Sequence, residues 1–251
     1  MNDSTFVRWR WTVLLLWTGF FASCGLETYT YLYPISTDSI SSDKNVKYYQ
    51  FTHNTDNDLD EFLGYEIFYK FYTPGSSEIL SDRSALEDVY LATESPVTGR
   101  KFSRLRLKRV SDSKVLDTTP LLPISRSQRG TPWVFRIDFS PLLLSPQEPP
   151  ILIWYQSDGT TEVERYILLR ESRPEGGDEE TFVPDQFLES DPDVLDMNVS
   201  NIVQNRGSLA VVFAVAAFGR NLDTSYLYSN IVFLNRSSSP EDDVLTIDLG
   251  P

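Results

Sequence analysis

Cys24 is the residue of this 251-residue chain whose chemistry is best defined by its neighbours. It is the only cysteine, and it follows an uncharged apolar run over residues 11–21 that Arg8 and Arg10 precede. These 11 residues match the apolar core of a signal peptide and fall short of the roughly 20 that a membrane-spanning helix needs. Two small residues then lead to the thiol, as expected at a processing site.

The segment Ala22-Ser23-Cys24-Gly25 resembles the lipobox of bacterial lipoproteins, in which a lipid is attached to the cysteine sulfur and the chain is cut just before it. Phe21 stands where Leu is usual, a looser pattern that is similar to that of spirochaetal lipoproteins. The resemblance implies a signal peptide over residues 1–23, lipidation of Cys24 and a place in the bacterial cell envelope. The alternatives are an ordinary secretory signal with an incidental cysteine, or an uncut N-terminal anchor helix.

Histidine and thiol chemistry are restricted by composition. His53 is the only histidine, so the chain has no histidine pair for a metal and only one base for a Ser-His-Asp arrangement. It follows an apolar run and precedes a polar turn, which predicts an exposed or hydrogen-bonded loop histidine. A lipidated Cys24 would leave no free thiol. We therefore expect no catalytic residue, no metal ligand and no cofactor-binding residue.

Three other groups could bind a ligand. Trp133, Trp154 and Tyr155 could stack on sugar rings if exposed side by side, but Trp133 alternates with apolar residues and is expected in the core. The acidic run 56–61 is similar to the start of a calcium loop, but it lacks the glycine at the sixth position. The basic run 104–109 is expected to be a solvated strand face that offsets nearby acids.

The net charge of −14 argues against a basic face for nucleic acid or anionic lipid. Aromatic residues make up 13% of the chain, which favours β structure. The expected organisation is the signal peptide 1–23, the lipidated cysteine with a tether over 24–45, a β-sandwich domain over 46–235 and an acidic polar tail over 236–251. Within the domain we expect one inserted helix over residues 81–93 and an acidic surface loop over 172–193.

Alternating apolar residues predict strands over most of the domain. Residues 62–72 carry aromatic side chains on both faces, which predicts a central strand covered on both sides. Asp158-Gly159 predicts a hairpin between strands at 151–156 and 162–170. Further strands are expected at residues 46–53, 102–110, 133–139, 196–203, 209–218, 228–234 and 244–249.

Two segments resemble a fibronectin type III domain. Residues 64–70, Gly-Tyr-Glu-Ile-Phe-Tyr-Lys, are similar to its third strand, and residues 214–219 followed by 228–232 are similar to its last two strands. The resemblance implies an all-β, immunoglobulin or fibronectin III-like sandwich with the helix and extra hairpins as insertions. It transfers no active-site residue.

The expected function is therefore that of a non-enzymatic binding or assembly module. We expect a lipid-anchored envelope protein whose partners are the membrane, through the lipid on Cys24, and an envelope protein, without nucleic acid. The alternatives are a carbohydrate-binding or adhesive surface protein and, with less support, a hydrolase that uses carboxylates.

Overall fold

The computed structural model describes residues 30–43, 45–87, 93–171, 179–197, 199, 202, 207–236 and 244–249. The chain divides into a unit of residues 1–31 and a unit from Leu32 to Pro251. Cys24 and the expected signal peptide lie outside the described residues. In the part of the chain that is described, no helix is long and apolar enough to cross a membrane. All elements named below belong to the second unit.

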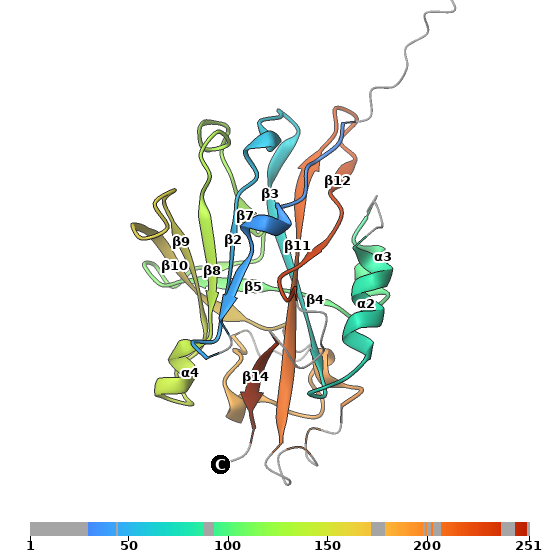
Figure 1. The fold of residues 1–251 in the computed structure, drawn as a ribbon, viewed down its shortest axis with the longest axis vertical. Coiled ribbons are helices and arrows are strands. Elements are labelled where there is room, and N and C mark those ends of the chain that lie inside the picture. The colour runs from blue at the N-terminus through green and yellow to red at the C-terminus, as the bar shows by residue number, and fades with distance from the viewer. Residues whose placement is uncertain are drawn as a thin grey trace, which may run out of the picture. The chain divides into compact units, whose positions relative to one another are not determined.

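Two antiparallel sheets and few helices make up this unit, which confirms the predicted mainly-β class (Figure 1). Sheet A has the strand order β1-β2-β8-β9-β10-β5-β6. Its strands are β1 Ser41–Asp43, β2 Tyr48–Thr52, β5 Arg106–Arg109, β6 Val115–Leu116, β8 Val134–Asp138, β9 Ile151–Tyr155 and β10 Glu162–Leu169.

Sheet B is built on the order β12-β11-β3-β4, with β13 and β14 also paired to β11 and β7 paired to β3. Its strands are β3 Phe62–Tyr72, β4 Ser103–Arg104, β7 Leu122–Pro123, β11 Ser208–Arg220, β12 Tyr226–Tyr228, β13 Val232–Phe233 and β14 Leu245–Asp248. The helices are α2 Glu78–Leu86, α3 Ser95–Thr98 and α4 Ser140–Leu144, and the 3-10 turns are η1 Thr37–Ser39, η2 Thr55–Asn57, η3 Arg126–Gln128, η4 Pro184–Gln186 and η5 Pro192–Val194.

The central position of β3 is confirmed, because its two faces pack into two different cores. Tyr65 and Tyr69 join the core between the sheets, together with Phe135 from sheet A. Phe68 and Tyr72 point the other way and pack with the apolar side of α2. Successive residues of a strand face opposite sides of the sheet. Because β3 has aromatic residues at both odd and even positions, both of its faces must be covered by other parts of the chain. Helices α2 and α3 supply that cover on one side of sheet B (Figure 1).

Strand β11 is the other buried strand, as its continuous apolar run predicts. It pairs with β3 along nearly its whole length, from Ala210 opposite Tyr72 to Gly219 opposite Phe62. A Cβ on Gly219 would lie 2.4 Å from the backbone oxygen of Glu61. The glycine therefore permits the close approach of the two chains at this end.

The single strand expected over residues 102–110 is wrong, because the chain changes sheets at Leu105. β4 pairs with β3 in sheet B, and β5 pairs with β10 in sheet A. Phe102 packs under the helices, whereas Leu105 and Leu107 lie between the sheets. Positions 102 and 105 have opposite parity, so one strand would also place them on opposite faces. The break shows instead in the pairing, which changes from β3 at Ser103–Arg104 to β10 at Arg106–Arg109. The expected strand over 228–234 is likewise divided into β12 and β13.

The boundaries expected at both ends of the domain are also corrected. Leu32 and Ile35 are buried in the core and β1 pairs with β2, so residues 32–43 are packed structure and not tether. β14 pairs with β11, and Leu249 is buried in the same core, so the acidic tail returns to the domain. Both segments carry apolar residues, and the burial of these residues away from water stabilises the folded state.

One inserted helix was expected, but the described residues include α2, α3 and α4 and also helical positions at Val199 and Ile202. α2 begins at Glu78, three residues before the expected start, and residues 88–92 lie outside the described residues. Pro96 follows the expected helix and lies in the first turn of α3, where a missing N–H costs nothing. The strand expected over 196–203 is wrong at Val199 and Ile202, which are helical.

Candidate functional site

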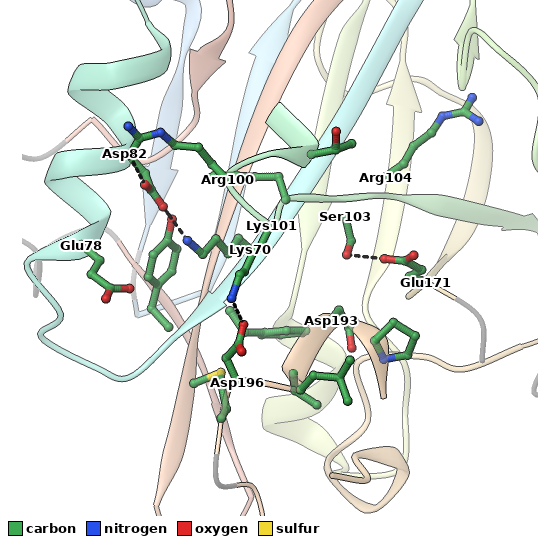
Figure 2. Close-up of a pocket in the computed structure, with 18 of the residues that line it drawn as sticks. Lys70, Glu78, Asp82, Arg100, Lys101, Ser103, Arg104, Glu171, Asp193 and Asp196 are labelled. Carbon is green, nitrogen blue, oxygen red and sulfur yellow. Dashed lines mark hydrogen bonds and ion pairs between the residues drawn. The ribbon is translucent and has the colours of Figure 1, made fainter. Parts of the chain in front are cut away.

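A groove of about 1410 Å³ opens on the side of sheet B that carries the helices (Figure 2). Its lining comes from the end of β3, from α2, from α3 with the turn after it, from β4 and from residues 192–197. Most of its charged side chains come from segments far apart in sequence. The groove is the candidate site, and residues 192–197 are called its far wall.

Asp82 of α2 organises one side of the groove. Its carboxylate accepts hydrogen bonds from Lys70 at 2.6 Å, from Tyr72 at 2.8 Å and from Arg100 at 2.8 Å. Burial acts to raise the pKa of Asp82, but these three donors outweigh burial and hold the pKa below its ordinary value. Asp82 is therefore a fixed anion that attaches α2 and the turn after α3 to the surface of β3.

Glu66 and Arg104 form a second ion pair at the groove, in which Glu66 is buried and Arg104 belongs to the lining. Nε and Nη2 of Arg104 donate to the two carboxylate oxygens of Glu66 at 2.6 and 2.9 Å, and Nη2 also donates to the carbonyl of Thr118. Burial raises the pKa of Glu66 to about 6, although the Arg104 guanidinium acts to lower it. Desolvation thus exceeds the attraction of the partner at this carboxylate.

The remaining members of the basic run 104–109 also have acidic neighbours. Lys108 pairs with Glu179, Arg109 with Asp112 and Glu164, and Arg106 lies 3.9 Å from Asp117. This arrangement agrees with the interpretation of the run as a strand face that offsets nearby acids.

Lys101 and Asp196 form an ion pair that joins the turn after α3 to the far wall (Figure 2). Both side chains are 67% exposed, so water screens the pair, and it contributes about 1 kcal/mol or less. This contact across the groove is far more exposed than the Lys70–Asp82 and Arg104–Glu66 pairs.

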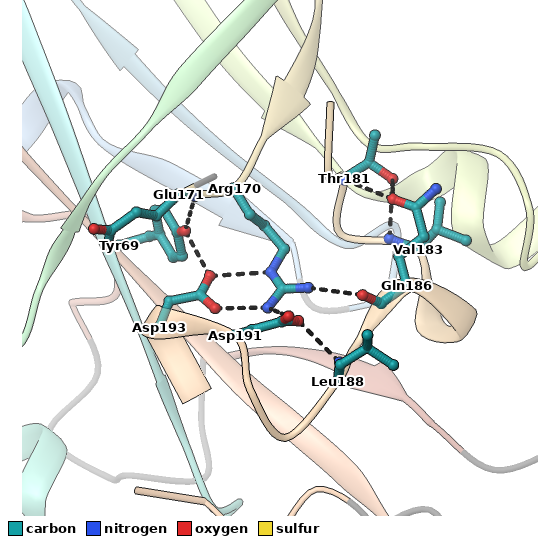
Figure 3. Close-up of polar contacts among 9 residues, drawn as sticks. All are labelled: Tyr69, Arg170, Glu171, Thr181, Val183, Gln186, Leu188, Asp191 and Asp193. Atoms are coloured by element: carbon teal, nitrogen blue, oxygen red, sulfur yellow. Dashed lines mark hydrogen bonds and ion pairs between the residues drawn. The ribbon is translucent and has the colours of Figure 1, made fainter. Parts of the chain in front are cut away.

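Arg170, the residue that follows β10, holds the far wall in place through ion pairs (Figure 3). Its side chain is fully buried and donates to Asp193 at 2.6 and 3.0 Å and to Asp191 at 2.9 Å. The guanidinium also lies 3.8 Å from the ring centre of Phe187. Tyr69 donates to Asp193 at 2.6 Å and accepts from the backbone N–H of Glu171 at 2.7 Å.

This network corrects the acidic surface loop expected over residues 172–193. Residues 172–178 lie outside the described residues, but residues 179–193 are packed against the domain, with Phe182 and Phe187 buried. A pattern in the sequence does indicate that this segment packs against the domain. Tyr166 and Leu168 share one face of β10, and Arg170, the residue after the strand, continues their alternation. The alternation therefore places a cation in the core, and a buried cation requires acidic partners.

His53 is hydrogen-bonded, as predicted, but it is buried and not exposed. Its side chain is 2% exposed; Nε2 lies 2.7 Å from the Arg129 carbonyl, and Nδ1 lies 2.7 Å from the Tyr65 hydroxyl. A carbonyl only accepts, so Nε2 carries the proton and Nδ1 accepts from Tyr65. Tyr65 in turn accepts from the N–H of Asn54 at 3.0 Å. Burial lowers the pKa of His53, and the ring is a neutral structural element.

The other candidate residues do not meet in the groove. The rings of Trp133 and Trp154 are 5.6 Å apart at 89°, with Trp154 buried and Trp133 packed against the core, so they form no flat exposed platform. In the acidic run 56–61, Asp60 pairs with Arg126 at 2.9 Å. Across the described residues, no group of three His, Cys, Asp or Glu side chains could hold a metal ion.

Comparison with models of protein families, with curated proteins and with solved structures finds no match. The chemistry of the groove is therefore the guide to function. Its described side chains combine fixed ion pairs with exposed carboxylates, and this arrangement suits electrostatic recognition of a ligand.

Proposed function

We propose that this protein is a lipid-anchored cell-envelope protein that acts as a non-catalytic binding or assembly module. The observation that carries the proposal is the groove, a large concave surface whose buried charges are held in place by ion pairs. Rigidly placed charges favour recognition because little ordering is needed when a ligand binds. The signal-peptide-like segment and Cys24 support the anchor.

The domain belongs to the immunoglobulin or fibronectin III-like type of sandwich. In that type, the third strand and the last two strands lie together in one sheet. The order β12-β11-β3 supports this assignment, because β3, β11 and β12 include the segments whose sequences resemble those three strands. The hairpin of β9 and β10, the β5–β6 hairpin and the helices are additions to this plan.

The anchor is tested with Cys24→Ser in the native host. The wild type is expected to partition into the detergent phase with a lipid-modified N-terminal Cys24, because several acyl chains give stable membrane binding. Cys24→Ser is expected to lose the lipid and to enter the aqueous phase, while Ser23→Ala serves as a matched control that keeps a small residue at the processing site. Recovery of an unmodified wild type from the aqueous phase contradicts the proposed anchor.

The binding role is tested by photo-crosslinking in native membranes. A crosslinking amino acid at Leu195, an exposed residue of the far wall, is expected to capture a specific envelope protein. The same amino acid at Leu144 is the control, because Leu144 is also exposed but belongs to α4 and does not line the groove. Equal patterns from both positions, or no adduct from Leu195, would refute the groove as the binding surface.

A further inference from the structure

Part of one edge of β3 lies in the groove and has no strand partner among the described residues. β11 covers one side of β3, while β7 pairs with the other side at Gly64–Tyr65 and β4 at Phe68–Tyr69. No strand of the described chain continues this second side along residues 70–72. A strand edge of this kind presents N–H and C=O groups that can pair with another chain.

The reason for the free edge lies in the turn after α3. Continuing the β3–β4 register would place Lys101 opposite Phe71. Lys101 instead has a φ of 63°, and its N–H bonds to the Thr98 carbonyl at 2.8 Å. Pairing with β3 therefore begins only at Ser103, and residues 71–73 line the groove.

The charges that remain available in the groove are negative. Five cations line it, and each has an acidic neighbour within 4.0 Å: Lys70, Arg100, Lys101, Arg104 and Arg106. Glu78, Glu94 and Glu171 also line it, and they form no ion pair within the described part of the chain. Figure 2 shows Glu78 and Glu171 on either side of the Lys101–Asp196 pair.

We propose that the groove binds an extended peptide segment of a partner protein that carries Lys or Arg side chains. The segment adds as a short strand to residues 70–72 of β3, and its basic side chains approach the exposed carboxylates of the groove. Backbone pairing gives the orientation, and the carboxylates select cationic side chains. The inference depends on the proposed binding role but not on the lipid anchor.

The affinity for the peptide is expected to depend in opposite ways on the two charges of the Lys101–Asp196 pair. Because the pair is exposed and weak, a basic side chain of the peptide can replace Lys101 at Asp196. Removing the charge of Lys101 therefore favours the peptide, whereas removing the charge of Asp196 disfavours it. Both substitutions break the same ion pair. If only the loss of this pair mattered, the peptide affinity would change in the same direction in both variants.

The test is fluorescence anisotropy on the full chain in detergent, with a labelled Lys-Val-Lys-Val-Lys-Val-Lys peptide as the probe. We expect saturable binding, tighter by at least threefold in Lys101→Gln and weaker by at least threefold in Asp196→Asn and in Glu94→Gln/Glu171→Gln. Glu162→Gln is the matched control, because Glu162 is an exposed acid of β10 outside the groove. Circular dichroism verifies that each variant is folded.

Two further peptides separate strand addition from plain charge attraction. A Glu-Val peptide of equal length is expected not to bind, and a Lys-Val peptide with proline at its centre is expected to bind at least tenfold more weakly, because proline removes a backbone donor. Equal affinity of the proline peptide, or no saturable binding of the first peptide, overturns the inference. If Leu195 still crosslinks a partner in that case, the proposed binding role survives without the basic strand.

Discussion

At the scale of single residues, Arg170 is the side chain on which the far wall depends most. Arg170→Met leaves Asp191 and Asp193 buried without their cation, so we expect a loss of about 3–5 kcal/mol in the free energy of unfolding. Denaturant unfolding measures this loss. Arg165→Met is the control, because the Arg165–Glu162 pair is exposed and contributes about 1 kcal/mol or less. Equal losses in the two variants would contradict the role of Arg170.

His53 allows a direct test of a buried neutral ring, because no other histidine contributes to the spectrum. We expect NMR titration to give a pKa below 6.5 and the tautomer protonated at Nε2. Below pH 6.5 the unfolded chain binds a proton that the folded chain excludes, so this residue contributes stability above pH 6.5 that is lost as the pH falls. A pKa at or above 6.5 contradicts the buried arrangement.

Glu66 gives a pH dependence of the opposite sign. Its pKa rises from 4.5 to about 6 on folding, so between these values the folded state holds the proton and the unfolded state has lost it. Its contribution to stability is therefore present below pH 4.5 and is lost as the pH rises through 6, by at most about 2 kcal/mol. Glu66→Gln is expected to remove this contribution from the pH profile of denaturant unfolding, and an unchanged profile would contradict it.

At the scale of elements, the close approach of β11 to the end of β3 depends on Gly219. A Cβ there would lie 2.4 Å from the Glu61 oxygen, so Gly219→Ala is expected to cost about 1–3 kcal/mol through displacement of the backbone. The control is Gly130→Ala, because a Cβ at Gly130 meets nothing within 4 Å. Thermal unfolding compares the two variants, and equal midpoints would show that the contact relaxes without cost.

The elements that could be predicted from sequence are those whose apolar pattern is local and long. β3 matches the expected residues 62–72, and the Asp158-Gly159 turn joins β9 to β10 as expected. The change of sheet at Leu105 could not be predicted, because a short basic run gives the same alternation whether the chain stays in one sheet or crosses to the other. Tertiary packing decided that case.

The groove was not predictable for a related reason. Its side chains come from strands, helices and turns that meet only in the folded chain, and no motif joins Glu66 to Arg104 or Lys101 to Asp196. The basic run to which Arg104 belongs, and its role in offsetting acids, could be predicted from the sequence. The exposed carboxylates at residues 78, 94 and 171 could not be singled out, because isolated acids are common on any soluble surface.

At the scale of the whole molecule, the folded unit begins at Leu32 and not at the expected residue 46. The variant that lacks residues 1–31 serves as the reference. A variant that lacks residues 1–45 also loses Leu32, Ile35 and two hydrogen bonds between Tyr33 and Asn57. Burial of each aliphatic side chain contributes about 1.5–3 kcal/mol, so we expect a loss of several kcal/mol in denaturant unfolding. Equal free energies of unfolding in the two variants would support the tether that was expected over residues 24–45.

The two ends of the folded unit lie at opposite ends of β11. Leu32 lies beside Gly219, whereas β14 pairs with residues 208–211 (Figure 1). At about 3.4 Å per residue, this 13-residue strand separates them by about 40 Å. Because β14 runs antiparallel to β11 and ends away from Leu32, tension applied between the two ends pulls β14 along β11. Its four residue pairs then carry the force together, in shear, instead of opening one after another.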